Sequence, residues 1–153
     1  MIDAAESIES RLDDPFAVEP SAPYAFLSEK PSIREMLDRL ILSKEVWTAA
    51  LEGRDWPQER GMRTQVLRER FESSAEEWRR VVRTARDRSA WDDAFVDVTC
   101  DPPRSFTYGG MVAHVLTWSA HRRHVLIGAL QTLGAGVGSG DPLEWEQPAA
   151  TEN

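Results

Sequence analysis

Hydrophobic side chains recur at helical spacing in three long segments of the chain. The first segment covers residues 32–52, where apolar residues follow one another three or four positions apart. Ser32 and Glu35 form a capping-box pattern at its start, and Gly53 is a residue type that commonly ends a helix. The pattern predicts a helix over residues 32–52.

The second and third segments cover residues 63–88 and 108–133. The second has an apolar stripe and charged residues on its other faces, which are expected to be solvated. Glu76 and Arg80 lie one helical turn apart on that surface, in the favourable order for an ion pair. Thr107 precedes the third segment as an expected N-cap. Two further long helices are therefore predicted.

The remaining segments show weaker patterns. Residues 2–12 fit a short helix with its apolar residues inward, and residues 13–31 carry four prolines and suggest an irregular arm. A long connection, residues 89–106, contains the short strand-like piece Phe95–Val98, and residues 134–142 form a glycine-rich turn. No clear sheet is expected.

This order of elements favours an all-α protein, an up-down antiparallel helix bundle with long connections that permit crossovers. We expect a single domain. It consists of a short helix and arm at residues 1–31, a bundle core at 32–134, and a turn and tail at 135–153. The tail is expected to dock through Trp145.

Composition narrows the function classes. The 153 residues carry a net charge of -8, which argues against a nucleic-acid-binding protein because such proteins usually present a basic face. No apolar run is long enough to span a membrane, and no signal peptide is evident. Cys100, the single cysteine, suits a reducing compartment, so a cytoplasmic location is expected; a structural or incidental role for this thiol is favoured over a catalytic one.

All three histidines, His114, His121 and His124, fall on the third predicted helix. His114 and His121 are two turns apart, about 10.5 Å along the axis, so they cannot share one ion. His121 and His124 could share the edge of a metal site, but that site would need ligands from another helix. We therefore expect polar histidines beside the core and no bound metal.

Arg122 lies on the apolar stripe of the same helix, one turn after Trp118. A charged side chain directed into a bundle is costly unless it is paired or faces a wet cavity. Arg122 could reach the edge of the bundle or pair with a carboxylate such as Asp38 or Glu45. Alternatively, it could face a ligand pocket between the helices.

The segment FTYGGMVAHVLTWSAHRRHVLIGALQTLG, Phe106–Gly134, resembles the final helix of the DinB/YfiT-like superfamily. Ser32–Gly53 resembles that family's second helix, and Trp78 fits its middle helix. The resemblance covers residues 32–134 and implies a four-helix bundle, with Met1–Leu12 as the remnant of the first helix. Members are usually metal-dependent, with thiol transfer and isomerisation among their activities.

The resemblance also implies that the metal site is lost. The family's second-helix histidine position is occupied by Arg39, and its two histidines four residues apart fall on Trp118 and Arg122. His114 matches an early histidine that is not a ligand, and His121 matches the residue before the second ligand. Since arginine stays protonated and cannot bind a divalent cation, no metal and no other cofactor are expected.

Three functional hypotheses follow. The first is a metal-free binding or regulatory module without assured catalysis, which takes a small acidic ligand in a pocket formed by Arg39, Trp118, His121 and Arg122. The second is a thiol-dependent transferase, or a related metal-dependent enzyme, with an atypical site near His121 and His124. The third is a structural or partner-binding role.

Two structural expectations accompany these hypotheses. Arg39 and Arg122 should approach each other, which requires a counter-charge. Asp38 and Glu45 are slightly favoured over a bound anion as its source. Because the first helix is short, part of the bundle core should be uncovered, and we expect a homodimer that covers it.

Overall fold

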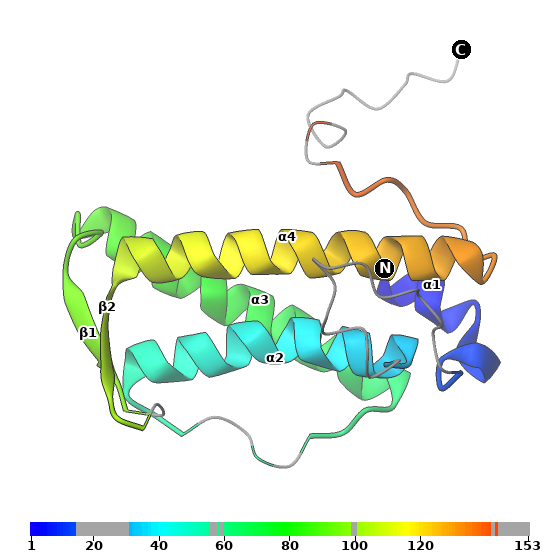
Figure 1. Cartoon of the computed structure of the whole chain (residues 1–153), viewed down its shortest axis with the longest axis horizontal. Helices are drawn as coiled ribbons and strands as arrows, with labels where there is room; N and C mark the ends of the chain where they lie inside the picture. Colours follow the sequence, from blue (N-terminus) through cyan, green and yellow to red (C-terminus); the bar gives the residue numbers. More distant parts are fainter. Residues whose placement is uncertain (15–30, 56–57, 59, 99–100, 142, 144–153) are drawn as a thin grey trace.

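We describe a computed structural model of the chain, which places residues 1–14, 31–55, 58, 60–98, 101–141 and 143. The three long helices predicted from the sequence are present and are labelled α2 (Ile33–Glu52), α3 (Thr64–Asp87) and α4 (Tyr108–Thr132) (Figure 1). Most of the proline-containing arm, Cys100 and Trp145 lie outside the described residues. In the described part of the chain, no helix has both the length and the apolar character to cross a membrane.

The helix ends form where the sequence predicts them. The Ser32 hydroxyl accepts a hydrogen bond from the backbone of Glu35, and the Glu35 side chain accepts one in return, which completes the capping box of α2. Gly53 ends this helix in a left-handed conformation with φ +62°. At the start of α4, the Thr107 hydroxyl accepts a hydrogen bond from the backbone of Gly110 at 3.1 Å.

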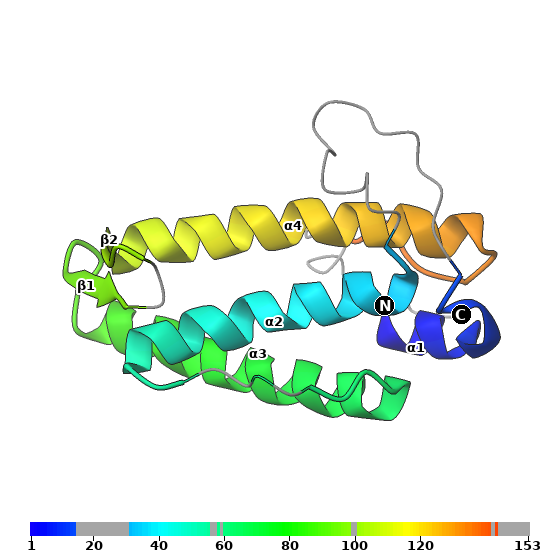
Figure 2. The ribbon, with the colours of Figure 1, turned by 60° about the horizontal axis from the view of Figure 1, so that its bottom comes forward.

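The helices do not alternate strictly up and down as expected. Arg34 near the start of α2 contacts Thr64 at the start of α3, and Glu52 at the end of α2 contacts Arg80 near the end of α3. These two helices therefore run parallel, and α3 begins beside the start of α2 (Figures 1 and 2). Only α4 runs in the opposite direction among these three. The long connections account for the difference, because they permit crossovers.

A two-stranded antiparallel sheet closes one end of the bundle, which corrects the expectation of no sheet. Strand β1 (Ala94–Asp97) pairs with β2 (Arg104–Thr107), so that Phe95 lies opposite Phe106. The piece of strand predicted near Phe95 is thus half of a hairpin. The second strand escaped prediction because four residues with one aromatic side chain are too short to show an alternating pattern.

The N-terminal segment covers the opposite end. It forms the short helix α1 (Ile2–Glu6), which is followed by a 3-10 helix at Glu9–Arg11. Ile2 and Leu12 are buried in the core. Arg34 of α2 fastens this segment, because its guanidinium donates to Asp13 and Glu9 at 2.8 and 3.0 Å.

Two apolar clusters form the core, and α2 packs against both α3 and α4. The larger cluster lies at the α1 end, where Leu37 and Ile41 of α2 join Leu126 and Leu130 of α4. The smaller one lies at the hairpin end around Trp78, Met111 and Val115. On α2, the larger cluster extends to Ile41 and the smaller one begins at Trp47.

Candidate functional site

The most spacious of the described pockets is an open groove between α2 and α4, with a volume of about 300 Å³. This size is at the lower end for small-molecule sites. Each helix contributes residues three, four or seven positions apart, which therefore lie on one helical face. The lining residues are Arg39, Leu42, Ser43, Val46 and Trp47 of α2, and His114, Trp118 and Arg122 of α4.

The charge of the groove is opposite in sign to that of the whole chain. Its described lining includes the guanidinium groups of Arg39 and Arg122 and the imidazole of His114, but no carboxylate. The chain as a whole has a net charge of -8. Such a local excess of positive groups favours an anionic ligand over a cationic one.

The walls of the groove are apolar and aromatic. The Arg122 guanidinium lies 4.2 Å from the Trp118 ring centroid, a cation–π contact that holds both side chains in place. Trp47 packs edge-on against His114 at 5.6 Å and against Phe106 of the hairpin at 5.8 Å between ring centroids. The hairpin thus supports one end of the groove.

Three of the four residues predicted from the sequence for a ligand pocket line this groove: Arg39, Trp118 and Arg122. His121 is half-buried on α4 but is not among the lining residues, because it is offset around the helix from Trp118 and Arg122. The pocket opens on the outer side of the α2–α4 pair and not in the bundle centre, so His114 takes part in its place.

Sequence reasoning missed five of the lining residues. Leu42, Ser43, Val46 and Trp47 share the helical face of Arg39, and His114 lies one turn before Trp118. A search for residues three, four, seven and eight positions from Arg39 would have found the first four. What the sequence could not supply was the pairing of this face of α2 with α4.

The two carboxylates favoured from the sequence as counter-charges, Asp38 and Glu45, are engaged by an arginine of α3. Asp38 and Glu45 both accept hydrogen bonds from Arg70 of α3, each at 2.7 Å. Burial lowers the pKa of Arg70, but the hydrogen bonds to Glu45 and Asp38 outweigh it, and the net shift of this pKa is upward. The two carboxylates lie on the α3 side of α2, away from the groove.

The prediction that Glu76 and Arg80 form a surface ion pair was wrong. Arg80 pairs with Glu52 of α2, and Glu76 pairs with Arg79 at 3.0 Å. The parallel packing of α2 and α3 brings Glu52 within reach of Arg80, and so an interhelical pair replaces the local one.

Metal ligands do not gather in the described part of the chain. No three His, Cys, Asp or Glu side chains among these residues lie close enough to hold one ion. His114 and His124 are exposed, and His121 is half-buried. Cys100 lies outside the described residues.

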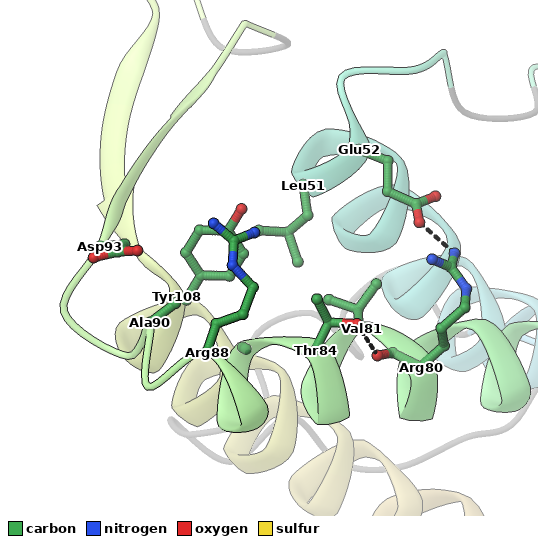
Figure 3. Close-up of a pocket in the computed structure, with 10 residues that line it drawn as sticks. Leu51, Glu52, Arg80, Val81, Thr84, Arg88, Ala90, Asp93 and Tyr108 are labelled. Carbon is green, nitrogen blue, oxygen red and sulfur yellow. Dashed lines mark hydrogen bonds and ion pairs between the residues drawn. The ribbon is translucent and has the colours of Figure 1, made fainter.

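A smaller pocket of about 130 Å³ lies where the hairpin meets the ends of α2 and α3 (Figure 3). Figure 3 shows Glu52 bonded to Arg80 on one side, with Arg88, Asp93 and Tyr108 on the other. Its lining carries charges of both signs, and Arg80 is already paired. This pocket therefore offers no net charge preference, which distinguishes it from the α2–α4 groove.

Comparison of the chain with protein-family models, with curated proteins and with solved structures found no match. The interpretation of the site therefore depends on its own chemistry.

Proposed function

We propose that this chain is a metal-free, DinB-like helix-bundle protein that binds a small acidic ligand in the α2–α4 groove and acts as a binding or regulatory module. The observation that carries this proposal is the lining of the groove. Arg39, Arg122 and His114 provide positive or hydrogen-bond-donating groups, and no carboxylate is present among the described lining residues.

The walls of the groove suggest the ligand class. A guanidinium group can bind both oxygens of a carboxylate or phosphate through its planar fork. Next to the arginines, Trp118, Trp47 and Val46 offer apolar surface for the rest of the molecule. We infer a small carboxylic acid with an aromatic or branched aliphatic group, because such a ligand would use both kinds of wall.

The proposed DinB-like relationship gives these residues a further meaning. In that alignment, Arg39, Trp118 and Arg122 stand at the positions of the family's metal ligands. Fixed guanidinium charges can attract an anion as a metal does, but they supply no Lewis acid and no activated water. The proposal is therefore binding and not catalysis.

Tryptophan fluorescence provides the test, because Trp47 and Trp118 line the groove. Titration with phenylacetate should change the emission in a saturable way, and phenylacetamide, a neutral isostere, should bind more weakly. Arg39→Gln should weaken phenylacetate binding about tenfold to a hundredfold, since a hydrogen bond to a charged group contributes about 1.5–3 kcal/mol. The matched control is Arg83→Gln, which removes an exposed arginine of α3.

Two results would contradict the proposal. Equal affinity for phenylacetate and phenylacetamide would show that charge is not recognised. The absence of saturable binding for phenylacetate, hexanoate and phenyl phosphate would show that the groove is not a site for small acids.

A further inference from the structure

One wall of the small pocket at the hairpin end is a turn, residues 88–93, that joins α3 to β1. Backbone hydrogen bonds fasten this turn to the first residues of α4. The Tyr108 N–H group donates to the Asp93 carbonyl at 3.1 Å, and the Gly109 N–H group donates to the Trp91 carbonyl at 2.8 Å. A Cβ atom at Gly109 would lie 3.0 Å from that Trp91 oxygen, so the absence of a side chain permits the close approach. The wall is therefore held in place before any ligand arrives.

The turn carries two side chains of opposite charge, Arg88 and Asp93, which line the exposed rim of this pocket. Among the described residues, neither side chain has a hydrogen bond or an ion pair, and the two do not pair with each other. The Tyr108 hydroxyl, on the same side, likewise has no hydrogen-bond partner in the described part of the chain. Figure 3 shows the Arg88 side chain directed toward Tyr108 and Leu51. These polar groups are therefore available to a ligand.

The charged groups on the opposite side are already engaged. The carboxylate of Glu52 accepts a hydrogen bond from Arg54 at 2.7 Å through one oxygen and from Arg80 through the other. The positive and negative charges on that side are thus largely neutralised by each other. Asp93 is therefore the carboxylate that remains for a cationic group of a ligand, and Arg88 is the cation that remains for an anionic group.

Apolar side chains form the floor between the two sides. Val81 and Ala85 of α3 and Ala90 of the turn are buried, and Leu51 of α2 completes the surface. An aliphatic group that covers this floor would remove apolar surface from water. The volume of about 130 Å³ is well below that of sites for larger ligands, so only a molecule with few heavy atoms fits.

We propose that this pocket binds the zwitterion of a small aliphatic α-amino acid. The ligand's carboxylate accepts hydrogen bonds from the Arg88 guanidinium and the Tyr108 hydroxyl. Its ammonium group donates to Asp93, and its side chain lies against Leu51 and Val81. A molecule with two separated charges and no net charge matches this lining, whereas an anion would meet the carboxylate of Asp93 and a cation would meet the guanidinium of Arg88.

Amide NMR spectra of the ¹⁵N-labelled full chain, recorded during titration with L-valine, test the proposal. We expect saturable shifts for the amides of residues 88–93 and of Gly109. Two analogues each lack one charge of L-valine: 3-methylbutanoate has no ammonium group, and 2-methylpropylamine has no carboxylate. Each should bind about tenfold more weakly or less, because it leaves one charged group of the pocket without a partner.

Substitutions in the turn separate the two charged contacts. Arg88→Gln and Asp93→Asn should each weaken L-valine binding about tenfold, which is the lower end for a hydrogen bond to a charged group, because the rim is exposed. The matched controls are Arg86→Gln and Asp92→Asn, which remove neighbouring exposed charges that are not among the lining residues. Both controls should keep the wild-type affinity, and the same spectra establish that each variant is folded.

Four results would overturn the proposal. Equal affinity for L-valine and 3-methylbutanoate would show that the pocket recognises a carboxylate alone. Equal losses in the turn variants and their controls would show that the two charges do not contact the ligand. Shifts confined to the α2–α4 groove would assign the amino acid to that site, and the absence of saturable shifts would show that it does not bind. Arg39→Gln, in the groove, should leave L-valine binding unchanged, so that this proposal and the proposed function are tested separately.

Discussion

The Nη1 atom of Arg70 lies 2.7 Å from the Oδ1 atom of Asp38, in the interface between two helices that run parallel. Glu45, two turns along α2 from Asp38, bonds the other side of the same guanidinium at 2.7 and 2.9 Å. The side chains are 14% exposed for Arg70, 9% for Asp38 and 13% for Glu45. One arginine of α3 thus joins two carboxylates of α2 in a largely water-excluded interface.

Removal of this arginine should be strongly destabilising. Arg70→Met leaves Glu45 without this partner and Asp38 with Arg60 alone, at 3.5 Å, and we expect a loss of about 3 kcal/mol in the free energy of unfolding, measured by urea denaturation near neutral pH. The triple variant Arg70→Met, Asp38→Leu, Glu45→Met should recover part of the loss, because it removes the three charges of this network and leaves only Arg60 without Asp38. Arg83→Gln is the control. A loss below about 0.5 kcal/mol for Arg70→Met would show that water screens this network.

The Arg70 network illustrates what the sequence could and could not predict. Helix positions were predictable, since Ser32, Gly53 and Thr107 are local markers whose function depends on residues within one turn. The pairing of helices was not predictable, because the local sequence around Asp38 does not indicate whether this side chain faces α3 or α4. The parallel arrangement of α2 and α3 depends on the crossover connection, and length alone does not fix its path.

The candidate site was predictable to a similar extent. The helical phase of α4 placed Trp118 and Arg122 on one face, and the resemblance to the DinB family drew attention to Arg39. Both steps lead to residues that line the groove. The sequence placed a possible pocket between the helices without saying between which ones, and the groove lies between α2 and α4.

Trp118 should contribute moderately to stability. Full burial would predict a loss of about 3–5 kcal/mol for Trp118→Ala, but the side chain is half-buried and its ring contacts Arg122. We therefore expect a loss of about 1–3 kcal/mol in the free energy of unfolding. Leu116→Ala, on the same helix at 58% exposure, should change it by less than about 0.5 kcal/mol. Equal effects of the two substitutions would indicate that the assigned phase of α4 is wrong.

Attachment of the N-terminal segment should depend on pH through Glu9. Hydrogen bonds from Thr64 and Arg34 lower the pKa of Glu9 below its ordinary value of 4.5. A carboxyl whose pKa is lower in the folded state stabilises that state above its unfolded pKa, and this contribution is lost as the pH falls through the folded pKa. The stability difference between wild type and Glu9→Gln should therefore be present at about pH 7 and shrink as the pH falls below the ordinary pKa of 4.5. A difference that stays constant throughout an acid titration would contradict this assignment.

Dimer formation is expected because the first helix is short. Helix α1 covers only Ile2–Glu6, and the exposed apolar side chains include Leu116 of α4 and Val96 of the hairpin. A second copy of the chain could cover such surface. Light scattering at high protein concentration should then give about twice the chain mass of 17.3 kDa, whereas a mass that stays at the single-chain value would contradict the prediction.

The last prediction concerns metal content. Protein purified without a histidine tag should contain no stoichiometric zinc, nickel or iron. Arg39, Trp118 and Arg122 occupy the positions that the DinB resemblance assigns to ligands, and arginine cannot give up its proton to bind a cation. His114 and His121 are separated by two helical turns, so they cannot share an ion. Elemental analysis that returned about one metal per chain would contradict both the prediction and the proposed binding function. His121→Ala and His124→Ala would then locate the ion, since these two histidines are three residues apart and could form the edge of a site.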